Sequence, residues 1–367
     1  MTFASQTEIL DLRHFQARQL RPLLEQEAVL WQQRLRWDYG SSIELLLQYL
    51  DQQILPGFVA LRGGVVCGYC FYVYEGTKAV IGDIFVLPDT PLRMEVTERL
   101  TRHLLEVLEA SPDVDRIEAQ LLLFDVGVLS HTFTERGFSI YPRLFLECEL
   151  PERELPGAFA WPEDVELCGW MAGFYQPSAE LIHAAYVGHL DAEINDQYRT
   201  LHGSLRFLHN IVRFPGCGVF DAEGSWVLRH RQTNALLGVI LCSQVAPGVA
   251  HVAQLCIATE LRGLNLGRQL LRHCMAALAA RGCAAVTLTV SEDNHAALSL
   301  YKAIGFTTRL RFEALVLQKH AASGRSLLKL LPGIDEAPDL TSVARAQASE
   351  TSGLFSFARR KTTPARR

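Results

Sequence analysis

A short segment with two arginines and two glycines has the composition of a site for a phosphate-bearing ligand. It runs from Ile257 to Arg268 (IATELRGLNLGR) and leads into a run with helical periodicity. Free N–H groups at a helix start and the helix dipole favour anions, and Gly263 and Gly267 let the main chain approach phosphates closely. Arg262 adds a permanent positive charge. The alternative is an ordinary helix start whose glycines serve packing.

A second segment whose residues could take part in a reaction lies about thirty residues further along the chain, at Asn294 to Phe306 (NHAALSLYKAIGF). It is typical of a short helix that begins after Asn294 and ends at Gly305. Tyr301 supplies a phenol, a group that can act as a general acid. The alternatives are a half-buried aromatic for Tyr301 and a simple helix cap for Asn294.

Taken in order, the two segments resemble the coenzyme-A-binding core of the GNAT superfamily of N-acetyltransferases. Arg262, Asn265 and Gly267 fall on the family pattern Arg/Gln-x-x-Gly-x-Gly/Ala. Asn265 replaces the usual glycine, and Asn tolerates a left-handed backbone better than other residues with a side chain. The second segment matches the family spacing from Asn294 to Tyr301. The resemblance is strong over residues 160–320 and weak over 1–150, and the tandem layout is similar to that of the mycothiol synthases.

The resemblance implies acetyl-CoA as the co-substrate, no metal, and Tyr301 as the proton donor. It also implies that a strand splays from its parallel neighbour, so that main-chain N–H groups hold the pantetheine arm and polarise the thioester. An ordinary buried strand is the alternative there. The residues implied in cofactor binding are Leu255, Cys256, Ile257, Arg262, Gly263, Leu264, Asn265, Leu266, Gly267, Arg268, Asn294 and Tyr301.

The acceptor side of the site is harder to predict. The stretch from Tyr186 to Tyr198 is dense in polar groups. Its residues His189, Asp191 and Asn195 are expected either to bind the amine or to form a solvated helix and loop. They resemble metal ligands in spacing, but no thiol accompanies them. The candidate general bases, with a chain of water molecules as the alternative, are His251, Glu292 and Asp293.

Composition and charge exclude several other classes of protein. The 367 residues are 49% hydrophobic and 20% charged, as in a globular protein. No apolar run approaches the ~18 residues that span a membrane, and the net charge of −5 argues against general nucleic-acid binding. Nine cysteines in mostly apolar stretches, and an N-terminus unlike a signal peptide, predict reduced thiols and a cytoplasmic protein. The Cys67-x-x-Cys70 spacing lies in a strand-like run, which favours a structural role.

The expected elements occur twice in the same order. In each half, helices precede three strands, a long helix, a strand, a short helix and a last strand. Aligning Gly137-Phe138 with Gly305-Phe306 superposes the halves at an offset near 168 residues. We expect an α/β (α+β) protein with two tandem acyl-CoA N-acyltransferase folds, each a mixed twisted sheet flanked by helices. The expected parts are a degenerate domain over 1–150, a linker over 151–162, an active domain over 163–320 and a mobile basic tail over 321–367.

The first half lacks the residues that carry the chemistry. In the superposition Phe133 takes the place of Tyr301, and Val126 takes that of Asn294. The stretch from Pro88 to Glu95 replaces the glycine turn, and its two acids and two prolines disfavour a pyrophosphate. We therefore expect one coenzyme A for each chain, bound by the second half.

We interpret the chain as an N-acetyltransferase that moves an acetyl group from acetyl-CoA directly to a primary amine. The alternative is a non-catalytic sensor of acyl-CoA that signals to a partner, and Tyr301, which simple binding does not need, favours the enzyme. The acceptor can be a small molecule or a peptide. Neither nucleic acid nor a membrane is expected as a partner, and the sequence does not indicate an oligomeric state.

Overall fold

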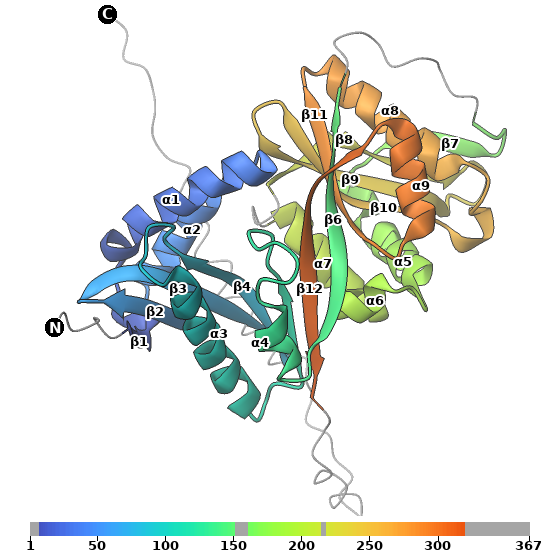
Figure 1. Ribbon diagram of the computed structural model, residues 1–367. Helices are drawn as coiled ribbons and strands as arrows, with labels where there is room; N and C mark the ends of the chain where they lie inside the picture. Colours follow the sequence, from blue (N-terminus) through green and yellow to red (C-terminus); the bar gives the residue numbers. More distant parts are fainter. Residues whose placement is uncertain (1–6, 151–160, 214–217, 320–367) are drawn as a thin grey trace, which may run out of the picture. The chain divides into compact units, whose positions relative to one another are not determined.

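The structure, a computed structural model, describes residues 7–150, 161–213 and 218–319 (Figure 1). Most of the expected linker and all of the expected tail, 321–367, lie outside these residues. Within them, the predicted elements occur in the predicted order in both halves, and the predicted α/β class is confirmed. Each half also begins with a short strand that was not predicted, Thr7–Asp11 in the first half and Val165–Gly169 in the second.

The first half begins with β1 (Thr7–Asp11), η1 (Leu12–His14), α1 (Ala17–Leu35) and α2 (Gly40–Asp51). It continues with β2 (Gly57–Arg62), β3 (Val65–Glu75), β4 (Lys78–Val86), α3 (Arg93–Ala110), β5 (Arg116–Gln120), α4 (Ser130–Thr134) and β6 (Ser139–Glu149).

The second half begins with β7 (Val165–Gly169), η2 (Ala172–Phe174), α5 (Tyr175–Tyr186), α6 (Asp191–Ile194), η3 (Asp196–Arg199) and α7 (Leu201–Arg213). It continues with β8 (Val219–His230), β9 (Leu236–Ala246), β10 (Val249–Ile257), η4 (Thr259–Leu261), α8 (Leu266–Ala280), β11 (Ala285–Ser291), α9 (His295–Ile304) and β12 (Thr307–Gln318).

Helices cover both faces of the sheet because neighbouring strand residues point to opposite faces. In β9, Ile240 packs in the core with α8 and α9, whereas its neighbour Leu241 packs in the core with α5 and α7. In β2, Ala60 packs with α3, whereas Val59 packs with α1 and α2. Strands buried on both faces read as continuous apolar runs, which is why they could be predicted from sequence.

The two halves exchange their last strands. The strands join into one sheet in the order β1-β2-β3-β4-β5-β12-β6-β11-β10-β9-β8-β7. The last strand of the second half, β12, pairs with β5 of the first, and β6 pairs with β11 of the second. The two exchanged strands also pair with each other, and Figure 1 shows them side by side. A division of the chain near residue 150 therefore does not divide the sheet.

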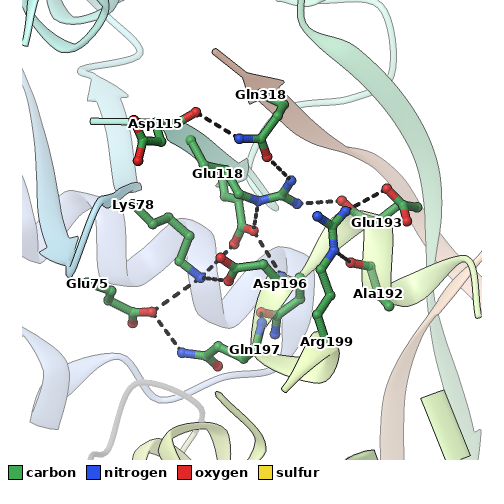
Figure 2. A network of polar contacts seen from close by, with 12 residues as sticks. Glu75, Lys78, Asp115, Glu118, Ala192, Glu193, Asp196, Gln197, Arg199 and Gln318 are labelled. Carbon is green, nitrogen blue, oxygen red and sulfur yellow. Dashed lines mark hydrogen bonds and ion pairs between the residues drawn. The ribbon is translucent and has the colours of Figure 1, made fainter. Parts of the chain in front are cut away.

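A polar network joins the start of β4 and β5 to the segment between α6 and α7 (Figure 2). The buried ammonium of Lys78 lies 3.0 Å from Glu118, 2.6 Å from Asp196 and 3.3 Å from Glu75. Burial acts to lower the pKa of Lys78, but these three carboxylates outweigh it and raise the pKa. Glu118 also accepts from the main-chain N–H of Asp196 at 3.1 Å. The first half thus anchors a segment of the second.

Candidate active site

A cleft opens where the parallel strands β10 and β11 diverge. The strands pair only over Val249–Val252, although β10 continues to Ile257. The register of β10 against β9 shifts between Val252 and Gln254, which places a bulge at Ala253. The predicted splay is therefore confirmed. Beyond Val252, main-chain groups of β10 are free of β11 and can meet a ligand.

A cavity of about 500 Å³ lies at this divergence, a size in the range of small-molecule sites. His189 and Asp191 contribute to its lining, but Leu264 is exposed and Leu266 packs in the core beneath α8. The other ten residues predicted for cofactor binding all line the cavity, namely Leu255, Cys256, Ile257, Arg262, Gly263, Asn265, Gly267, Arg268, Asn294 and Tyr301.

The turn that precedes α8 has left-handed backbone at two positions. Gly263 has a φ of 83° and Asn265 a φ of 63°. Gly adopts this conformation freely and Asn does so at low cost, so Asn265 can take the place of the usual glycine. The side chain of Asn265 makes no cap hydrogen bond to α8. The first N–H groups of α8 therefore remain available to an anion.

Two arginines bring positive charge to the same end of α8. The guanidinium of Arg262 donates to the main-chain oxygen of Ala185, which ties the turn to α5. The buried Nε of Arg268 has no hydrogen-bond partner among the described residues. Buried donors are rarely left unpaired, and a guanidinium beside free helix N–H groups suits a phosphate.

Gly267 lies in the first turn of α8, against the end of β10. A Cβ atom there would lie 3.4 Å from Cγ1 of Ile257 and 3.9 Å from Cδ1 of Leu300, which are ordinary contact distances. Alanine would therefore fit without displacing its neighbours. A larger, β-branched side chain would have to extend into the cavity or push these two residues aside.

Tyr301 lies on α9, in the cavity, with 9% of its surface exposed. Its ring packs against Phe306 at a centroid distance of 5.7 Å. Burial raises the pKa of Tyr301, and the carboxylate of Asp191 raises it further. The phenol therefore keeps its proton at neutral pH and can act as a donor. Asn294 caps α9 by accepting from the N–H of Ala297 at 3.2 Å, and it also lines the cavity.

A polar cluster faces the cavity from the segment that leads into α6. The carboxylate of Asp191 accepts a hydrogen bond from the hydroxyl of Ser291 and lies 3.9 Å from the guanidinium of Arg143. Nδ1 of His189 accepts from the main-chain N–H of Asp191 at 3.1 Å. Arg143 belongs to β6, so the strand exchange brings a charge of the first half next to Asp191. No local sequence pattern indicates this contact.

Tyr186 and Gln254 are cavity-lining residues that the sequence analysis did not identify. The hydroxyl of Tyr186 donates to Oε1 of Gln254 at 3.4 Å. Tyr186 stacks on Tyr198 with a centroid distance of 4.1 Å. The many polar and aromatic residues between Tyr186 and Tyr198 are the only sequence feature discussed above that indicates this side of the cavity.

Asn195 lies away from the cavity. Its side-chain oxygen accepts a hydrogen bond from the N–H of Gln197 at 3.0 Å and so caps the start of η3. The side chain therefore stabilises this local turn and does not face the site. Asx caps of this kind are set by the adjacent backbone. Asn195 is therefore placed apart from His189 and Asp191.

The three candidate general bases also lie outside this cavity. His251 is 5% exposed, its Nδ1 lies 2.9 Å from the hydroxyl of Thr287, and burial lowers its pKa to about 3. Glu292 forms an ion pair with Arg311 at 2.7 Å, and Asp293 is exposed. Asp191 and His189, in contrast, line the cavity, where they can receive a proton from an amine.

In the first half, other residue types occupy the positions that superpose on Tyr301, Asn294 and the glycine turn of the second half. Phe133 is fully buried and packs edge-on against Phe138 at 5.0 Å. Val126 is 40% exposed. The connection from β4 to α3 carries Asp89, and the first turn of α3 carries Glu95. These features are the ones expected of a degenerate copy of the cofactor site.

In residues 7–150, 161–213 and 218–319, no group of three or more His, Cys, Asp or Glu side chains is placed to hold a metal ion. No helix in these ranges is long and apolar enough to cross a membrane.

Comparison with known proteins identifies the fold and the class. Residues 190–306 match the sequence model of the acetyltransferase (GNAT) family. A GCN5-related N-acetyltransferase from Sphaerobacter thermophilus aligns over 92% of this chain and 99% of its own, with 14% identity and a TM-score of 0.58. A tandem GNAT protein from the clavulanic acid biosynthesis pathway aligns over 85% of this chain and 98% of its own, with 17% identity and a TM-score of 0.58. No curated protein matches the sequence.

At these identities the two solved structures show the fold, and the family model matches the half that contains the cavity. The fold and the family match together define an acyltransferase. Residues 190–306 thus match the GNAT family in sequence, and the chain shares the fold of a tandem GNAT protein.

Proposed function

We propose that this protein transfers an acetyl group from acetyl-CoA to the primary amine of a small molecule or peptide, and that the second half carries the reaction. One observation carries the proposal: the uncapped start of α8 and the buried phenol of Tyr301 line the same cavity. An anion site and a protonated phenol in one cleft suit a ligand that carries both phosphates and a thioester. Binding of coenzyme A alone would require only the first.

In the proposed reaction the phosphates lie at the start of α8, near Arg262 and Arg268. The pantetheine arm follows the main chain of β10 from Leu255 to Ile257, where no β11 partner competes for the hydrogen bonds. Arg268 has a buried donor without a partner, which supports its assignment to the phosphates.

The chemical step is direct transfer. The lone pair of the neutral amine attacks the thioester carbonyl, the C–N bond forms, and collapse of the tetrahedral species breaks the C–S bond. Tyr301 protonates the departing thiolate, and the amine proton passes to Asp191, directly or through water. The carboxylate of Asp191 lines the cavity and influences Tyr301 strongly enough to raise its pKa, which supports placing both at the reacting centre.

The competing function is that of a sensor that binds acyl-CoA without turnover. The two functions are distinguished by following free thiol release from acetyl-CoA in the presence of pooled amines and peptides. An enzyme should release thiol catalytically, with release dependent on the amine. Tight binding of acetyl-CoA with no turnover across the whole set would favour the sensor.

Gly267 offers a matched pair of variants for this assay. Gly267→Val should abolish thiol release, because its side chain occupies space needed by the cofactor. Gly267→Ala should retain most of it, since a Cβ meets only ordinary contacts. Equal activity of the valine variant and the wild type would remove the α8 turn from the proposed cofactor site.

A cytoplasmic location is part of the same proposal. The eight cysteines in the described part of the chain are all free, and seven of them are buried. This is the form that thiols keep in a reducing compartment.

A further inference from the structure

A second cavity lies where β4 and β5 of the first half diverge. These strands pair only over Lys78–Ile81, and the register of β4 shifts at Gly82. The divergence therefore repeats the feature that opens the active-site cleft in the second half. A cavity of about 430 Å³ lies there, and Gly82, Asp83 and Gln120 contribute to its lining. We call it the aromatic cavity.

Aromatic rings from the first half form much of its wall. Trp31 stacks between Tyr39, at a centroid distance of 4.7 Å, and Trp37, at 5.5 Å. The ring of Phe71 lies so close to the main chain of Gly82 that a Cβ atom there would be 2.1 Å from it. Glycine at position 82 thus allows an aromatic ring to line this cavity.

The aromatic cavity contains a buried acid that has no counter-charge. Asp83 is 4% exposed, and Oδ1 accepts from the N–H of Ile84 at 2.7 Å, but Oδ2 has no hydrogen-bond partner among the described residues. Glu27, fully buried behind the rings, accepts from Nε1 of Trp31 at 3.1 Å and from the hydroxyl of Tyr69 at 2.8 Å. The lining that the structure describes contains neither Lys nor Arg.

The two carboxyl groups act as one unit. Burial raises the pKa of Asp83 well above its usual range, and Glu27 raises it further. Burial likewise raises the pKa of Glu27. The two carboxyl groups also interact directly, and such a pair releases its two protons in separate steps, so that a single negative charge can be spread over both groups. His251, which lines the cavity from the second half, is neutral because burial lowers its pKa to about 3.

An uncompensated buried charge in an aromatic wall is costly to folding, since apolar side chains of similar volume would fill the space without that cost. Nε1 of Trp37, a second buried polar atom in this lining, also has no partner among the described residues. A cation satisfies both the acid and the ring faces, and an oxygen acceptor on the same molecule would satisfy Trp37.

We propose that the aromatic cavity binds an organic ammonium ion that also carries an oxygen acceptor, with Asp83 and Glu27 as its counter-charge and the rings of Trp31, Trp37 and Tyr39 around it. Thr289 lines both cavities, so the aromatic cavity adjoins the active-site cleft at that residue.

Calorimetric titration of the full chain, without acetyl-CoA, tests the site independently of any catalysis. The probes are two matched pairs: tyramine with tyrosol, and choline with 3,3-dimethylbutan-1-ol. Within each pair the shape is nearly constant and only the charge differs. Each cation should bind at least about tenfold more tightly than its neutral counterpart. The proposal is overturned if neither cation does so.

The double variant Glu27→Gln/Asp83→Asn provides the decisive comparison, because either acid alone can keep a negative charge at the site, and Asp89→Asn in the exposed turn after β4 is its control. The double variant should lose the preference for the cation, whereas the Asp89 variant should keep it. Removing the buried charge should also leave the melting temperature of the free protein unchanged or higher. A melting temperature that falls, with the cation preference intact, would show that the two acids are structural residues and refute the site.

A further arm distinguishes the origin of the cation. Acetylation of bound tyramine, prevented by the double variant Glu27→Gln/Asp83→Asn, would identify the cation as the acceptor. Binding of tyramine without acetylation would identify it as a separate ligand. Both results support the site, and binding that persists unchanged in the double variant contradicts it.

Discussion

Replacing Tyr301 with Phe should slow acetyl transfer while leaving the fold and the cofactor affinity nearly unchanged. The ring of Tyr301 is buried and packs on Phe306, and the substitution keeps that ring. What it removes is one hydroxyl, which is the group assigned to the leaving thiolate. The expected loss in turnover is about 10²–10⁴-fold, the usual contribution of general acid catalysis. It corresponds to roughly 2.7–5.5 kcal/mol of transition-state stabilisation.

Single-turnover measurements of thiol release at saturating acetyl-CoA would isolate the chemical step from product release. Tyr186→Phe is the matched control, because Tyr186 is half-buried, lines the same cavity and loses only a hydroxyl, the one that donates to Gln254. The control should change turnover much less than Tyr301→Phe.

The pH dependence gives a second readout. The pKa of Tyr301 is raised, mainly by burial. The wild type should therefore keep its acid through pH 8–9, and the ratio of wild-type to variant rates should stay constant up to that range. Unchanged turnover in Tyr301→Phe would remove this residue from the mechanism. Equal losses in binding and turnover would instead assign it a structural role.

Two further predictions concern the first half and the interface between the halves. Calorimetric titration of the full chain with acetyl-CoA should give one site for each chain, since Phe133, Val126 and the acidic β4–α3 connection replace the chemical residues in the first half; a stoichiometry near two would contradict this. His251 should make the stability of the fold depend on pH. Its pKa is about 3 in the folded protein and 6.5 in the unfolded chain, so the unfolded state binds more protons at intermediate pH. Stability is therefore lost as the pH falls below about 6.5. The loss should be roughly 1.4 kcal/mol for each pH unit, and a pH series of urea unfolding should show a shallower slope for His251→Gln; equal slopes would disprove the assignment.

The parts of the fold and site that depend on local sequence patterns could be predicted from the sequence. The spacing of Leu100, Leu104 and Leu108, close to 3.6 residues, is typical of a helix, and the structure has α3 there. The turn-forming residues Gly263 and Asn265 indicate where α8 begins. Ten of twelve predicted cofactor residues line one cavity because they belong to two contiguous segments and one strand end. Leu264 and Leu266 were included only by position: Leu264 is exposed in the turn before α8, and Leu266 at the start of α8 packs in the core.

The parts that depend on long-range contacts could not be predicted. An apolar strand such as β6 fits next to any parallel or antiparallel neighbour, so its pairing with β11 leaves no local trace, and neither does the arrival of Arg143 beside Asp191. Glu27 interrupts the apolar pattern of α1, and Asp83 interrupts that of β4, but only the packed rings bring the two acids together. His251 was considered as a base because of its strand, and the alternation of side chains across β10 directs it to the other cavity.

The exchange of last strands sets the order in which the chain can finish folding during synthesis. The free edge of β5 receives β12, whose residues Thr307–Gln318 emerge long after the rest of the first half. Until β12 has been synthesised, the edge of β5 has no partner strand there, and an unpaired strand edge can pair with other molecules. The first half, which lacks the proposed cofactor residues, therefore completes its part of the sheet only after β12 of the second half has been synthesised.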